Sequence, residues 1–190
     1  ALNRANGVEV WRQKMSNEML ALPQVMENRL VVQTIDGKIT ALNAETGQQL
    51  WRYDHPVPKL TLRGTSVPII IGNKVLAGFA DGKLVKLSLE TGELQWETTV
   101  AVPRGRTDLE RLVDIDGLFN VNDDIIYVSS YQGGVAAVSL DTGNILWARD
   151  MSSYVGVTVD KKQIYISDTT GRVWALDNRT GATLWRQDKL

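Results

Sequence analysis

One segment predicts the fold, Gly37-Lys38-Ile39-Thr40-Ala41-Leu42-Asn43-Ala44-Glu45-Thr46-Gly47-Gln48-Gln49-Leu50-Trp51, because the chain repeats its pattern. Matching segments run from Gly82 to Trp96, from Gly133 to Trp147 and from Gly171 to Trp185. In all four copies a second Gly follows the first by ten residues, and the Trp follows that second Gly by four. A fifth copy is cut short, since Gly7 precedes Trp11 by the same four residues. Self-similarity of this kind is the signature of a repeat fold.

Each copy has the pattern of two strands joined by a tight turn. Apolar and small residues such as Ile39 and Ala41 lead into a polar Asn-Ala-Glu-Thr-Gly turn, and a second short strand ends in Trp51. An apolar, mostly β-branched run precedes each copy, at residues 30–34, 74–77, 125–128 and 163–166. A less regular run before it, for example 67–70, brings the number to about four strands per repeat. No segment has a helical period.

The intervals between successive marker tryptophans are 40, 45, 51 and 38 residues, the length of a four-stranded propeller blade. We therefore predict an all-β fold: a β-propeller of four-stranded antiparallel blades, with about four complete blades plus part of a fifth, or half of an eight-bladed propeller. WD40 repeats share this period, but an Asp never follows the marker Trp here.

The whole of 1–190 is expected to be a single partial propeller. Residues 1–11 would end a truncated blade, and the complete blades would cover approximately 12–51, 52–96, 97–147 and 148–185. One tryptophan at a fixed place in every blade is expected to wedge into the next blade. These structural repeat markers are Trp11, Trp51, Trp96, Trp147 and Trp185.

The composition is that of a globular domain with a real core, with 43% hydrophobic and 23% charged residues. The net charge is −1 and the 21 Lys and Arg residues are spread along the chain, so a nucleic acid is not an expected partner. The absence of cysteine excludes disulfides and thiolate chemistry. No apolar run is long enough for a transmembrane helix, and no signal peptide is recognisable at the start.

The repeats differ in one kind of connection. From the marker Trp to the next opening Gly the distances are 26, 31, 37 and 24 residues, whereas Gly to Trp is constant. The two longest passages follow Trp51 and Trp96, in consecutive blades. Equivalent loops of a propeller emerge on one face, so these two are expected to lie side by side and form a binding surface.

Both passages mix apolar with charged residues, as a protein interface does. Other interpretations of these residues stay open. Leu60 and Leu62 alternate as inward residues of an innermost strand would, and Asp114 and Asp116 are suited to capping a turn or pairing with Arg111. An Asp-x-Asp pair without further oxygen ligands is weak support for Ca²⁺.

Catalytic motifs are missing from the sequence. The single histidine, His55, precedes a proline and is expected to be a loop residue rather than a base. No nucleophile set, phosphate loop or zinc spacing is recognisable. We therefore expect no enzymatic activity, no cofactor and no metal.

Residues 41–51 resemble the tryptophan-docking repeat of quinoprotein-like (PQQ-repeat) propellers, which implies the fold more than a function. Two further segments, Leu60-Thr-Leu-Arg-Gly64 and Glu110-Arg-Leu-Val-Asp-Ile-Asp116, resemble the signature loops of the BamB family, the lipoprotein propellers of the outer-membrane β-barrel assembly (BAM) machinery. This resemblance implies a non-enzymatic scaffold at the periplasmic face of the outer membrane. The residues that would contact the POTRA domains of BamA, within a complex of BAM subunits, are Leu60, Leu62, Arg63, Asp114 and Asp116.

The sequence departs from the family pattern in length. Family members carry a signal peptide, a lipidated N-terminal Cys and eight blades, so the resemblance implies a partial copy whose parent is lipid-anchored. Two other functions stay open: a fragment of a quinone-dependent dehydrogenase, and a general peptide-binding propeller that accepts unfolded outer-membrane proteins at an exposed edge. Because open propeller ends expose apolar surface, we also expect two copies to associate end to end.

Overall fold

The computed structural model describes residues 1–58, 66–102, 113, 115, 119–130, 133–151, 153 and 156–188. Within these residues the chain forms four antiparallel sheets of four strands each, in chain order within every sheet. Blade 1 contains β1 (Gln24–Met26), β2 (Arg29–Gln33), β3 (Lys38–Asn43) and β4 (Gln49–Asp54). Blade 2 contains β5 (Ile69–Ile71), β6 (Lys74–Gly78), β7 (Lys83–Ser88) and β8 (Leu94–Thr99). Blade 3 contains β9 (Asn120–Asn122), β10 (Ile125–Ser130), β11 (Gly134–Ser139) and β12 (Ile145–Arg149). Blade 4 contains β13 (Val157–Val159), β14 (Gln163–Ser167), β15 (Val173–Asp177) and β16 (Thr183–Gln187).

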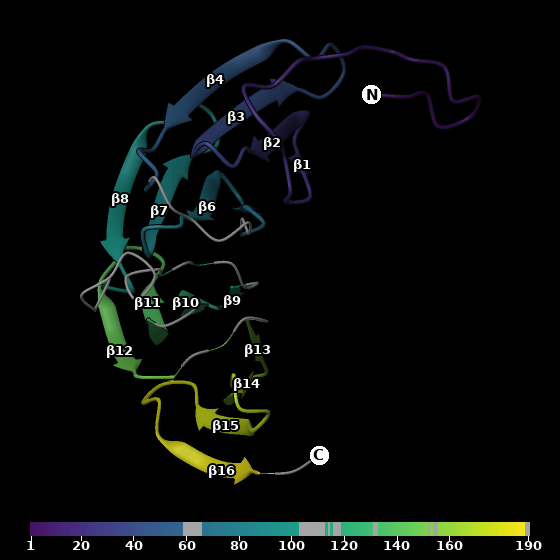
Figure 1. The fold of residues 1–190 in the computed structure, drawn as a ribbon. Helices are drawn as coiled ribbons and strands as arrows, with labels where there is room; N and C mark the ends of the chain where they lie inside the picture. The colour runs from purple at the N-terminus through teal and green to yellow at the C-terminus, as the bar shows by residue number, and fades with distance from the viewer. Residues whose placement is uncertain are drawn as a thin grey trace.

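The four blades follow one another along an open arc, with β4, β8, β12 and β16 on its outer side (Figure 1). The two chain ends lie at opposite ends of the arc. This arrangement confirms the predicted propeller architecture. Among the described residues, no helix is long and apolar enough to cross a bilayer.

The core of the molecule lies between the blades, because a single sheet cannot cover both of its own faces. Val31 and Ile39 of blade 1 pack with Val75 and Val85 of blade 2 in one buried cluster. Two further clusters join blade 2 to blade 3 and blade 3 to blade 4. Residues from the middle strands dominate these clusters, since β2, β3, β6 and β7 bury side chains on both faces.

The marker tryptophans bridge consecutive blades. Trp51 Nε1 donates a hydrogen bond to the carbonyl oxygen of Leu89, at 2.8 Å, in the Thr-Gly turn of blade 2. Its ring lies against Gly92 of that turn, where an added Cβ would come within 2.6 Å of Trp51 Cδ2. The same bond and the same glycine contact recur for Trp11 on blade 1, Trp96 on blade 3 and Trp147 on blade 4. Each of these marker tryptophans thus packs into the turn of the next blade and attaches the two blades to each other.

The two ends of this series are open. Trp185 is 46% exposed, and a Cβ added at Gly7 would meet no described atom within 4 Å. The turn around Gly7 nevertheless has the same backbone hydrogen bonds as the complete copies, Asn3 N to Val8 O and Gly7 N to Asn3 O. The turn thus matches those of the complete copies, while the assignment of residues 1–11 to the end of a truncated blade stays a prediction.

Candidate interaction site

The residues that the sequence predicts to contact a partner, Leu60, Leu62, Arg63, Asp114 and Asp116, lie outside the described residues. The structure describes their flanks. On the first passage these are residues 55–58 and Ser66, and on the second they are Ala101, Val113, Ile115 and Phe119.

Both passages are attached at the end of strand β6, at Gly78 and Phe79. The Ser66 hydroxyl donates to the carbonyl oxygen of Gly78 at 3.1 Å and accepts from the Gly78 N–H at 3.0 Å. The N–H of Ile115, the residue between Asp114 and Asp116, donates to the carbonyl oxygen of Phe79 at 3.4 Å. Segments almost fifty residues apart thus share one anchor.

The absence of a side chain at Gly78 allows this convergence. A Cβ atom there would lie 2.6 Å from Cγ2 of Ile115 and 2.9 Å from Oγ of Ser66, both far inside contact distance. Ile115 and Ser66 are completely or almost completely buried. The described residues Ser66 of the first passage and Ile115 of the second therefore lie side by side against Gly78.

His55 attaches the beginning of the first passage to blade 2. It follows β4 directly, and its side chain is only 2% exposed. The imidazole Nε2 lies 2.9 Å from Oδ2 of Asp81, and the ring is stacked on Phe79 with the centroids 4.0 Å apart. His55 is therefore a loop residue, but a buried one, and the sequence pattern did not indicate this burial or these partners.

Charged groups surround the imidazole. Glu97 Oε2 lies 3.7 Å from Nδ1 of His55, while Glu97 Oε1 binds the ammonium group of Lys83 at 2.6 Å. That hydrogen bond raises the pKa of Lys83 despite the opposing effect of desolvation. Burial, followed by the nearby Glu97 carboxylate, raises the pKa of Tyr53. The result is a partly buried network of acidic and basic groups at the joint between blades 1 and 2.

A metal centre is not formed by the described part of the chain, in which no three His, Asp or Glu side chains gather in a metal-binding group. The network around His55 has instead the character of a structural joint, with hydrogen bonds and ion pairs that cross from one blade to the next.

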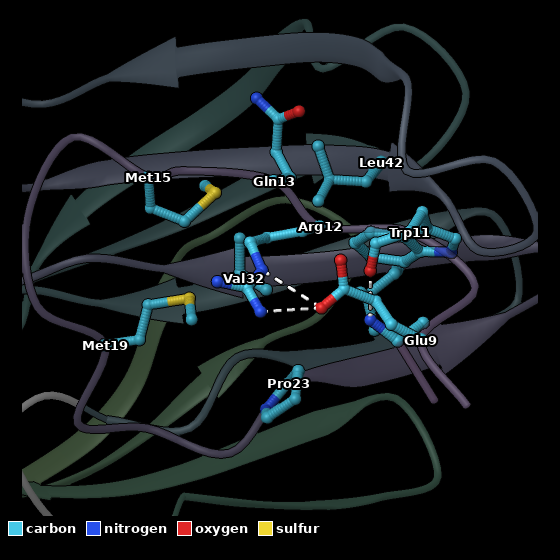
Figure 2. A pocket seen from close by; sticks show the side chains of 11 residues that line it. Glu9, Trp11, Arg12, Gln13, Met15, Met19, Pro23, Val32 and Leu42 are labelled. Carbon is cyan, nitrogen blue, oxygen red and sulfur yellow. Dashed lines mark hydrogen bonds and ion pairs between the residues drawn. The ribbon is translucent and has the colours of Figure 1, made fainter. Parts of the chain in front are cut away.

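A second candidate site is a hollow of about 280 Å³ on the N-terminal side of blade 1 (Figure 2). Met15, Met19 and Pro23 line it together with Val32 and Leu42 from β2 and β3. An exposed ion pair between Arg12 and Glu9, with 2.7 Å between the closest atoms, forms part of the lining. The rest of the lining is mostly apolar.

Comparison with known proteins identifies the family. The crystal structure of BamB from Moraxella catarrhalis matches 98% of this chain with a TM-score of 0.90 and 30% sequence identity. The family model described as outer membrane protein assembly factor BamB matches residues 1–187. The chain belongs to the BamB family. This confirms the resemblance inferred from the two loop segments.

Curated relatives in the BamB family carry the same description. The outer membrane protein assembly factor BamB of Alteromonas naphthalenivorans is 40% identical over 164 residues, which cover 86% of this chain and 39% of the relative. That of Shewanella oneidensis is 33% identical over 158 residues, covering 83% of this chain and 40% of the relative. The chain thus spans about 40% of the length of these relatives. A europium-containing methanol dehydrogenase, at 18% identity and a TM-score of 0.69, shares the propeller fold.

Proposed function

We propose that this chain acts as a non-enzymatic accessory subunit of the BAM machinery and assists the folding and insertion of outer-membrane proteins. Membership of the BamB family supports this, because the matched relatives are named outer membrane protein assembly factors. The proposed location is the periplasmic face of the outer membrane. A lipid anchor is proposed for the full-length parent.

One observation carries the proposal of a docking surface. Ser66, which follows the first predicted loop segment, and Ile115, which lies within the second, are both held against Gly78. A surface composed of two loops needs a rigid common base, because each loop must be ordered before it contributes to binding. The buried end of β6 supplies such a base.

The proposed partner is BamA, contacted through its POTRA domains within the BAM complex. Leu60 and Leu62 would provide the apolar anchor, since buried apolar contacts at the centre of an interface contribute most of the affinity. Arg63, Asp114 and Asp116 would set the orientation through charge-assisted hydrogen bonds.

The test is a binding titration of the 190-residue chain against purified BamA POTRA domains. We expect Arg63→Glu and Asp114→Lys each to weaken binding at least tenfold while the circular dichroism spectrum stays unchanged. Arg179→Glu and Glu45→Lys reverse exposed charges in the outer turns and serve as matched controls, expected to bind like the parent chain. Equal affinities for all five proteins would exclude the proposed surface.

A second candidate function is the capture of unfolded outer-membrane proteins by strand addition. The outer strands lie at the edges of their sheets and carry exposed apolar residues such as Leu50, Leu146 and Leu184. Each of these edges, however, carries a register irregularity against its neighbour, a feature that hinders pairing with another strand. Binding of a β-strand peptide in the absence of BamA would favour this second function.

A further inference from the structure

We propose that His55 is a positioning residue for the docking surface: by binding Asp81 of the neighbouring blade it holds the stem of the first loop in the geometry that meets the partner. This inference rests on the function proposed above and deepens it. The stem consists of residues 55–58, which lead from β4 toward the predicted contact residues.

The contacts of His55 cross between two blades. Its backbone N–H donates to the carbonyl oxygen of Gly37 in blade 1 at 2.9 Å. Its side chain meets Phe79 and Asp81, both in the β6–β7 turn of blade 2. A buried imidazole needs a hydrogen-bond partner, and a carboxylate is a strong one because its charge assists the bond. The stem is thus held at two points.

A comparison with blade 1 shows that this pairing is specific to blade 2. The tripeptide Asp-Gly-Lys occupies the same turn in both blades, at 36–38 and 81–83. In blade 1 the lysine ammonium of Lys38 binds Asp36. In blade 2 the ammonium of Lys83 binds Glu97 instead, and Oδ2 of Asp81 faces His55. The same tripeptide therefore forms different ion pairs and hydrogen bonds in the two blades, and in blade 2 the Asp81 carboxylate binds His55 of the stem.

The described residues of the following joint differ from those at His55. Ala101 occupies the position of His55 one blade later, since its carbonyl oxygen approaches Gly82 as that of His55 approaches Gly37. Its side chain packs beside Ser130, which corresponds to Phe79. Among the residues that the structure describes at this joint, an alanine and a serine thus stand where the preceding joint has His55 and Phe79. The contacts of His55 with Phe79 and Asp81 lie where the first predicted loop begins.

The test uses three variants of the 190-residue chain. His55→Phe keeps an aromatic ring against Phe79 but removes the donor, Asp81→Ala removes the acceptor, and the double variant removes both. Asp81→Asn keeps an acceptor and serves as the conservative control. Two quantities are measured for each: the hydrogen-exchange rate of the His55 amide, with the amides of β2 as an internal reference, and the affinity for BamA POTRA domains.

We expect both single variants to raise the exchange rate of the His55 amide about tenfold or more and to weaken POTRA binding by a similar factor, with β2 unchanged. The double variant is expected to resemble Asp81→Ala, because that change already removes both the bond to His55 and the bond that Asp81 Oδ1 accepts from the Lys83 N–H at 3.2 Å. Asp81→Asn is expected to stay within about threefold of the parent chain in both measurements.

The two measurements separate this inference from the proposed function. An unchanged exchange rate at His55 would overturn the inference, and so would faster exchange combined with unaltered POTRA affinity. Faster exchange with weaker binding would support it. If the parent chain itself does not bind POTRA domains, the proposed function fails and the positioning role fails with it, whereas the exchange data still report whether Asp81 holds the stem.

Discussion

Replacing Gly92 by alanine tests whether the contact of Trp51 with the turn of blade 2 holds the two blades together. Gly92 has a φ of +74°, and a Cβ there would lie 2.6 Å from both Cδ2 and Cε3 of Trp51. Gly171 provides a matched control, because its φ is +80° but a Cβ there would have no described atom within 4 Å. Both substitutions force an L-residue into the left-handed region, and Gly92→Ala alone also disturbs a tryptophan.

The expected cost follows from these contacts. A left-handed backbone costs an alanine about 1–2 kcal/mol at either position. At Gly92 the ring of Trp51, which is only 8% exposed, must also move, and overpacking of this kind costs about 1–3 kcal/mol. Loss of the bond from Trp51 Nε1 to Leu89 adds about 1 kcal/mol. We therefore expect Gly92→Ala to lower the free energy of unfolding by about 2–4 kcal/mol more than Gly171→Ala.

Urea unfolding followed by far-ultraviolet circular dichroism measures this difference. With a slope on the order of 1–3 kcal/mol per molar urea, the Gly92→Ala midpoint should lie about 1 M or more below that of Gly171→Ala. Equal midpoints would mean that the glycine is needed only for its backbone conformation, and would refute the argument that the blades are joined through the tryptophan contact.

Two further predictions concern the last blade. Asp168 accepts hydrogen bonds from Thr170 and from Trp174 Nε1; they outweigh the effect of burial and hold the pKa of Asp168 far below its usual range. The contribution of Asp168 to stability is present above a pH of about 4, the pKa of an aspartate in the unfolded chain, and is lost as the pH falls through the lower pKa of the folded state. Asp168→Asn should therefore flatten the decline in the free energy of unfolding that the parent chain shows below that pH. The second prediction is end-to-end association: light scattering should show a concentration-dependent dimer that Trp185→Ser weakens, and a monomer at every concentration would contradict it.

Much of the fold was predictable because the information is local. Period-two alternation, a polar Thr-Gly turn and a tryptophan at constant spacing are properties of fifteen consecutive residues, and the blades in the structure show the strands that these patterns predict. The unequal lengths of the connections likewise singled out the passages after Trp51 and Trp96, and Ser66 and Ile115 from these two passages meet at Gly78. The contacts proposed for Leu60, Leu62, Arg63, Asp114 and Asp116 stay predictions.

The number and type of the repeats, and the two connections that differ from the rest, follow from the amino-acid sequence alone. Which side chains meet at the joints depends on how the blades pack in three dimensions. His55 and Asp81 are separated by 26 residues, and nothing in the neighbourhood of either one indicates the other. The physical reason is that propensity and turn chemistry act over a few residues, whereas the partner of a buried polar group depends on how one sheet packs against the next. The same tripeptide at 36–38 and 81–83 consequently forms an internal ion pair in one blade and binds the preceding loop in the other.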